Sequence, residues 1–164
     1  MGVIRPLRKF VFLAAWLYGA SQGVSSGQTR VVPQLKEDIA VGIVKDVREF
    51  HQGGCELLRT TDKYASERYV FLSNFEGSAV MNLNGRDTKL MLIRETKAKG
   101  DLKERDRSSA WYRAGAVEVR VDYTVSGFCP PDHESCEVIY YNATVVVSRQ
   151  GVQKTVLAHG LCGS

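Results

Sequence analysis

Long hydrophobic runs are scarce in this chain, and the only one lies at residues 10–20. A membrane-spanning helix needs about 20 predominantly apolar residues, and no later run approaches that length. Three basic residues precede the apolar run and small residues follow it, which is the order of a secretory signal peptide. We therefore expect a signal peptide over residues 1–27 and a single exported domain over 28–164. That domain would be periplasmic or extracellular, with no integral membrane segment after cleavage.

An excess of one sign of charge is also missing outside this leader. The whole chain has 22 Lys and Arg against 18 Asp and Glu, a net charge of +4. Three of the basic residues and none of the acidic ones lie in residues 1–27, which leaves 19 basic against 18 acidic residues. Nucleic-acid binding requires a basic patch or stripe, so we expect no nucleic-acid partner.

Catalytic signatures are absent as well. The chain contains no Gly-x-Ser-x-Gly elbow, no His-Glu-x-x-His pair and no phosphate-binding P-loop. Enzyme function is therefore uncertain, and a non-catalytic role is favoured. An extracytoplasmic hydrolase with His133 or His159 as its acid–base group remains an alternative.

Cysteines are few, but all four lie after the leader. An even number of cysteines in an exported chain is typical of disulfides. Of the three possible pairings we favour Cys129–Cys136, which closes a short loop, and Cys55–Cys162, which ties the start of the domain to its end. A metal site is the alternative, but the spacings match no common zinc pattern. We expect no metal and no cofactor.

The pattern that is present is that of β-structure. Apolar and polar residues alternate from Val117 to Ser126, which predicts a strand with one buried face. The run Val138 to Ser148 is nearly all apolar and predicts a strand covered on both faces for part of its length. Asn84-Gly85 between two strand-like runs predicts a type I′ hairpin. We expect a mainly β fold, an antiparallel β-sandwich or small β-barrel of about seven to nine strands, stapled by two disulfides.

Two segments are less regular. Apolar residues in 33–50 fall at helical spacing, yet the stretch around Gly42 is β-branched, and we predict a strand over about 39–48. Residues 95–109 are rich in charge and predict a solvated loop.

The candidate binding residues lie around this loop. Trp111 and Tyr112 follow it, and Asp132, His133 and Glu134 lie inside the loop between Cys129 and Cys136. Aromatic rings and loops on a rigid β scaffold are suited to binding. We therefore expect a non-catalytic binding module whose partner is an unidentified protein or glycan. The alternative for each ring is a place in the core.

Part of the chain resembles a known family. Residues 78–90, followed by Ser108-Ser109-Ala110-Trp111-Tyr112, resemble the small periplasmic β-barrel inhibitors of lysozyme. The resemblance covers under a third of the chain, and Ser109-Ala110 departs from the Ser-Gly loop of those inhibitors. It implies a periplasmic or secreted inhibitor of a host or competitor enzyme such as lysozyme. A role in envelope assembly, by strand addition at an unpaired edge, is a further alternative.

Overall fold

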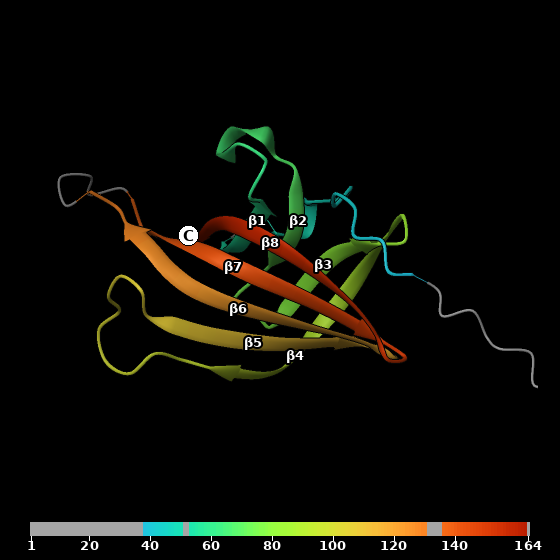
Figure 1. The fold of residues 1–164 in the computed structure, drawn as a ribbon. Helices are drawn as coiled ribbons and strands as arrows, with labels where there is room; N and C mark the ends of the chain where they lie inside the picture. Colours follow the sequence, from blue (N-terminus) through green and yellow to red (C-terminus); the bar gives the residue numbers. More distant parts are fainter. Residues whose placement is uncertain (1–37, 51–52, 131–135, 164) are drawn as a thin grey trace, which may run out of the picture. The chain divides into compact units, whose positions relative to one another are not determined.

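The computed structural model describes residues 38–50, 53–130 and 136–163. They form a closed antiparallel barrel in which each strand pairs with the next and the last returns to the first (Figure 1). The predicted fold class is therefore confirmed, as a barrel. Its eight strands are β1 (Gly54–Arg59), β2 (Tyr69–Ser73), β3 (Ser78–Leu83), β4 (Arg86–Thr96), β5 (Arg107–Ala114), β6 (Val117–Phe128), β7 (Val138–Arg149) and β8 (Val152–Gly163). Two single 3-10 turns, η1 (Arg48–Phe50) and η2 (Tyr64–Ser66), lie outside the barrel strands.

The two ends of the barrel differ in their connections. At one end the pairs β3–β4, β5–β6 and β7–β8 are joined by tight turns, including the predicted hairpin at Asn84-Gly85, while a longer segment with η2 joins β1 to β2. Both of its central residues have positive φ, 50° and 82°, as a type I′ turn requires. At the other end lie the β2–β3 turn (74–77) and the β4–β5 loop, which spans 97–106 and is shorter than the predicted 95–109. We call this second end the mouth of the barrel.

The interior follows from period-two alternation. On β6 the side chains of Val119, Val121, Tyr123 and Val125 are buried and their neighbours are more exposed, as predicted. The fully buried valines of β6 and β7 fill the interior, since an eight-stranded barrel is just wide enough for its own side chains or one small ligand.

The expectation that β7 would be covered on both faces for part of its length is met only in part. Its burial alternates along the strand: Tyr141, Ala143, Val145 and Val147 are buried, while Asn142 is exposed. The apolar residues between them lie on the outer face and are half-buried, and one of them, Tyr140, meets Tyr64 of η2 edge to face. High β-propensity suits such a strand with one buried and one half-buried face.

The predicted strand over 39–48 was also wrong. This segment makes only one isolated bridge, Val41 with Leu83, before the turn η1. Gly42 donates to the backbone oxygen of Asn82, whereas Val44 donates to Tyr69, so the segment changes partner from β3 to β2. Its β-branched residues Ile39 and Val41 are buried instead. They pack into the barrel core at the end opposite the mouth.

Asp87 anchors this segment to the barrel. Its carboxylate accepts hydrogen bonds from the backbone nitrogens of Lys45 and Asp46, at 2.8 and 2.9 Å, and from Asn82 Nδ2, at 2.6 Å. Burial acts to raise the pKa of Asp87, but these hydrogen bonds outweigh it and hold the pKa below its usual value. The segment is thus fixed by charge-assisted bonds rather than by a strand ladder.

Both predicted disulfides are confirmed. Cys55–Cys162 joins directly paired residues of β1 and β8, where the barrel closes, and Cys129–Cys136 closes the base of the β6–β7 connection. Among the residues that the structure describes, no helix is long and apolar enough to cross a membrane. The proposed signal peptide, residues 1–27, lies outside the described residues.

Candidate ligand cavity at the barrel mouth

A cavity of about 540 Å³ opens at the mouth of the barrel. Its walls come from β2, β4, β5, β6, β7 and the Cys55–Cys162 disulfide, and its rim comes from the β2–β3 turn and the β4–β5 loop. The valine-filled interior closes it below, and Ile39 and Val41 plug the far end of the core. The residues that carry its chemistry are Ser73, Phe75, Leu92, Glu95, Lys97, Leu102, Tyr112, Tyr123 and Tyr141.

Three tyrosines give the cavity its aromatic lining. The rings of Tyr123 and Tyr141 meet edge to face, with centroids 5.5 Å apart, and Tyr112 meets Phe71 in the same way at 5.3 Å. The three tyrosines are buried, with 6–8% of each residue exposed. They lie on neighbouring strands at positions where alternation points the side chain inward, so barrel closure brings them together.

Burial also governs the ionisation of these phenols. It raises the pKa of Tyr123 well above its usual value and raises that of Tyr141. Burial raises the pKa of Tyr112 too, although hydrogen bonding to Ser73 and Tyr123 opposes the shift. The three hydroxyls therefore stay protonated at neutral pH and can donate as well as accept hydrogen bonds.

The rim carries one ion pair and two exposed apolar groups. Glu95 lies opposite Ala110 on the inward face of β4 and pairs with Lys97 Nζ at 2.8 Å. Phe75 is 69% exposed and Leu102 is 37% exposed. Apolar groups standing at an open rim are available to contact a ligand as it enters.

Local hydrogen bonds hold this rim in shape. Asn74 Oδ1 accepts from the backbone nitrogens of Glu76, at 3.1 Å, and Ser78, at 2.9 Å, which fixes the β2–β3 turn. In the β4–β5 loop, Arg105 donates to the backbone oxygen of Val125, and the nitrogen of Val125 donates to Asp106. The loop is thereby tied to β6 beside the cavity.

Trp111 and Tyr112 are adjacent in the sequence but face opposite sides of the barrel wall. Tyr112 faces inward and lines the cavity, whereas Trp111 lies on the outer wall under Arg94, whose guanidinium is 3.8 Å from the ring centroid. They cannot contact the same small ligand, because neighbouring residues of a strand face opposite sides. The other three candidates, Asp132, His133 and Glu134, lie outside the described residues.

His159, the other candidate imidazole, lies on the outer wall. Its ring stacks on Tyr64 with centroids 4.3 Å apart, and Nε2 is buried without a hydrogen-bond partner among the described residues. In that same part of the chain, no three His, Cys, Asp or Glu side chains are grouped closely enough to hold a metal ion.

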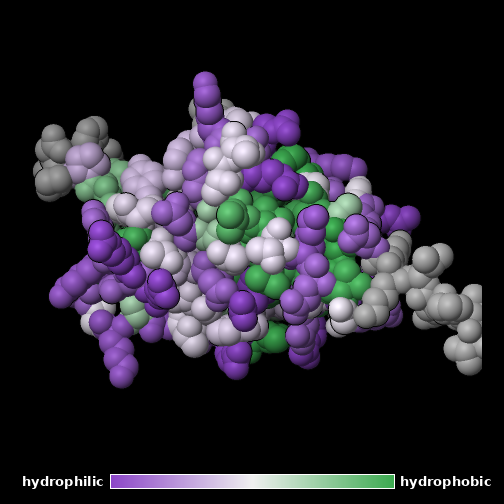
Figure 2. Space-filling view, viewed as in Figure 1, coloured by the Kyte–Doolittle hydropathy of each residue, from purple (hydrophilic) through white to green (hydrophobic). Residues whose placement is uncertain are grey.

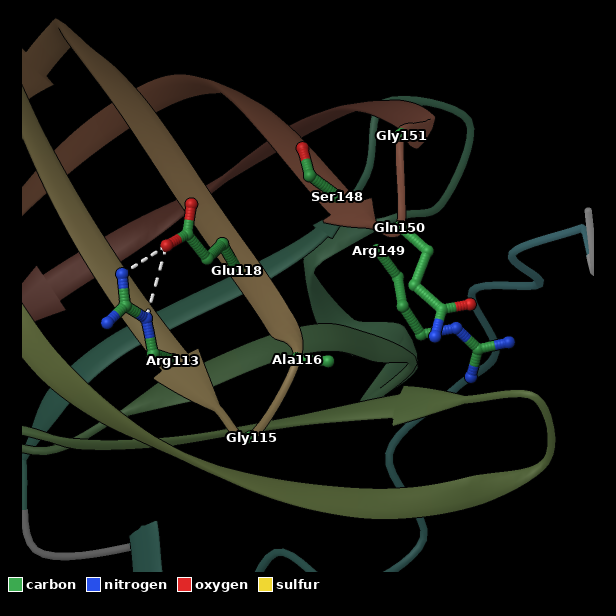
Figure 3. Close-up of a pocket in the computed structure, with 8 residues that line it drawn as sticks. All are labelled: Arg113, Gly115, Ala116, Glu118, Ser148, Arg149, Gln150 and Gly151. Atoms are coloured by element: carbon green, nitrogen blue, oxygen red, sulfur yellow. Dashed lines mark hydrogen bonds and ion pairs between the residues drawn. The ribbon is translucent and has the colours of Figure 1, made fainter.

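The outer surface is hollowed near the tight turns. The pocket drawn in Figure 3 has a volume of about 350 Å³ and lies between the β5–β6 and β7–β8 turns. Arg113 reaches across to Glu118 and pairs with it, while Arg149 and Gln150 extend away from that pair. Figure 2 shows a mainly hydrophilic surface on this view, with hydrophobic groups emerging over β7 and β8. Neither feature has the three-tyrosine lining of the mouth cavity.

Sequence reasoning did not single out Tyr123, Tyr141, Ser73 or Glu95 as site residues. The alternation on β6 predicts that Tyr123 points inward, and Tyr141 must oppose Tyr140. Tyr123 and Tyr141 line the same cavity because of the register in which their strands pair, and this register cannot be read from a local sequence pattern.

No protein-family model, curated protein or solved structure matches the chain. The resemblance of residues 78–90 and 108–112 to lysozyme inhibitors therefore stays a prediction.

Proposed function

We propose that this protein is an exported, non-catalytic binding protein that holds one small ligand in the mouth of its barrel. The tyrosine-lined cavity at the open mouth of the barrel is the observation that carries this proposal. Small-molecule sites commonly span about 300–1,000 Å³ and combine apolar walls with a few polar groups. The cavity of about 540 Å³ fits that description in volume and in lining.

The stability of the scaffold supports the same role. A disulfide ties the strands at the cavity wall, and hydrogen bonds fix both rim segments. A preformed site loses less conformational freedom on binding than a mobile one, so more of the contact energy appears as affinity. Two disulfides are also consistent with an oxidising compartment outside the cytoplasm.

Filling the cavity tests the proposal. Ala110 is 7% exposed and lines the cavity, so Ala110→Phe would occupy the space that a ligand needs. We expect a fragment screen by ligand-observed NMR to find binders for the wild-type protein, and expect Ala110→Phe to lose them. The milder Ala110→Leu should weaken the same binders, which guards against loss of binding through misfolding.

The matched control is Ala116→Phe. Ala116 lies in the β5–β6 turn at the opposite end of the barrel, so the same substitution there leaves the cavity unchanged. It should retain every binder of the wild-type protein. Binders that Ala116→Phe loses and folded Ala110→Phe keeps would refute the proposed site.

A further inference from the structure

We infer that the ligand of the mouth cavity is an uncharged compound of one or two rings, held by a hydrogen bond with the hydroxyl of Tyr141. The inference rests on the proposed function and specifies its ligand class. Three features of the cavity carry it: the balance of charge, the unpaired hydrogen-bonding capacity, and the shape of the aromatic lining.

Charge is the first feature. Of the described residues that line the cavity, only Glu95 and Lys97 are charged, and they neutralise each other at 2.8 Å. Both lie at the rim, with side chains 45% and 76% exposed. A charged group that entered more deeply would lose its water without meeting an opposite charge, which is costly. The buried end of the ligand is therefore uncharged.

Hydrogen-bonding capacity is the second feature. Tyr112, Tyr123 and Ser73 satisfy part of one another's needs through their hydroxyls. Tyr141 has its ring packed against Tyr123 and lines the cavity, and burial alone raises the pKa of its hydroxyl, with no hydrogen bond contributing to the shift. A phenol hydroxyl is both donor and acceptor, so an alcohol, phenol or carbonyl group on the ligand would pair with it.

The aromatic lining is the third feature. The rings of Tyr123 and Tyr141 meet edge to face at the cavity wall, Tyr112 adds a third ring, and Leu92 adds an aliphatic wall. Such walls favour flat or alicyclic apolar faces, because aromatic rings in edge-to-face or offset contact attract one another beyond the effect of area burial. A saccharide would place hydroxyls against much of this carbon surface, so a largely apolar ring is the better match.

Four probes that share a benzene ring, together with one saccharide, test the inference. Calorimetric titrations of the full protein would use benzyl alcohol, benzylamine, benzoate, toluene and methyl β-glucoside. We expect benzyl alcohol to bind about tenfold more tightly than the other four, because only it keeps the ring while offering an uncharged hydrogen-bonding group.

The adjacent residues Tyr140 and Tyr141 of β7 supply a test variant and its control. Tyr141→Phe removes the hydroxyl in the cavity and should reduce the affinity for benzyl alcohol about tenfold, to that for toluene. Toluene itself should bind Tyr141→Phe and wild type equally. Tyr140→Phe changes the neighbouring residue on the opposite face and should leave all five affinities unchanged.

The outcomes separate the two proposals. Equal or tighter binding of benzylamine, benzoate or the glucoside, blocked by Ala110→Phe, would overturn the ligand class and leave the binding cavity standing. An unchanged affinity of Tyr141→Phe for benzyl alcohol would also overturn the ligand class. If no probe binds at concentrations up to about 10 mM, which is weak even for fragments of this size, both proposals fall.

Discussion

Closure of the barrel depends on the absence of a side chain at Gly160 of β8. A side chain added there would place its Cβ 1.8 Å from the backbone oxygen of Glu56 on β1. The two strands that close the barrel therefore approach more closely at this point than any other residue would allow. Gly127 of β6 is different, because the nearest atom to an added Cβ lies 4.0 Å away.

We predict that Gly160→Ala lowers the free energy of unfolding by about 3 kcal/mol or more, since the added carbon forces backbone apart in a packed wall. Gly127→Ala should change it by less than about 1 kcal/mol. Chemical denaturation of both variants measures the difference. Equal stability of the two would contradict the close approach of β1 and β8.

The pKa of Tyr69 predicts how the folding stability changes in alkaline solution. Burial, assisted by the charge of Glu56, raises its pKa to about 12. The unfolded chain loses this phenol proton near pH 10, before the folded protein does, so folding stability declines as the pH rises between about 10 and 12. Denaturation curves across this range should show the decline. Tyr69→Phe should show a smaller one, and identical slopes would contradict the raised pKa.

At the scale of elements, the segment 38–50 takes the place of a ninth strand. It enters between β2 and β3, where these strands pair only through Leu72–Val80 and Ser73–Ala79. Its outer residues, Val44 and Phe50, form a small second core with Leu72 and Val80. The segment thus plugs one end of the barrel and leaves the mouth as the entrance to the cavity.

Removing the Asp87 carboxylate, which anchors the segment 38–50, should loosen that segment. Asp87→Ala leaves two backbone nitrogens and the buried Asn82 amide without an acceptor, so we predict a loss of about 2 kcal/mol of stability. Hydrogen exchange should quicken at residues 40–46 before it does in β6. The control is Asp46→Ala, which removes an exposed ion pair with Arg48 and should cost little.

The same bonds predict a response to acid. Because the pKa of Asp87 is lowered in the folded protein, its contribution to stability is present above about pH 4 and lost as the pH falls below that. The loss should be smaller in Asp87→Asn than in wild type. A wild-type stability that stays level on acidification would contradict the role of Asp87.

Strands with strict alternation could be predicted from the sequence, and the segment 39–48 could not. The pattern on β6 depends on one buried face, which period-two spacing records directly. The β-branched residues around Gly42 have strand propensity as well, but competition between β2 and β3 for their backbone groups decides the outcome. That competition is tertiary and leaves no local signal.

At the scale of the whole molecule, the two disulfides have unequal effects. Cys55–Cys162 closes a loop of 107 residues, whereas Cys129–Cys136 spans only 7. Chain-entropy arithmetic gives a loss of about 5 kcal/mol for Cys55→Ser with Cys162→Ser, and about 2–3 kcal/mol for the matched pair at 129 and 136. Thermal unfolding of the two double variants should rank them in that order, and the reverse order would refute this account.

The cavity is a property of the closed barrel and could be predicted only in part. A range of about seven to nine strands, the disulfides and the inward face of β6 could be predicted from local patterns and cysteine spacing, whereas closure into a barrel rather than a sandwich could not. The convergence of Tyr112, Tyr123 and Tyr141 depends on the register across β5, β6 and β7. Trp111 and Tyr112 are adjacent in sequence, but Trp111 lies on the outer surface of the barrel and Tyr112 lines the cavity.

The most direct test of the binding cavity is a titration of the isotope-labelled protein with benzyl alcohol, followed by backbone amide NMR. The account predicts saturable shifts at the mouth, around Ser73, Leu92, Ala110 and Tyr141, with the tight turns at 115–116 and 150–151 unaffected. Shifts centred on those turns, or none anywhere at saturating concentrations, would contradict it.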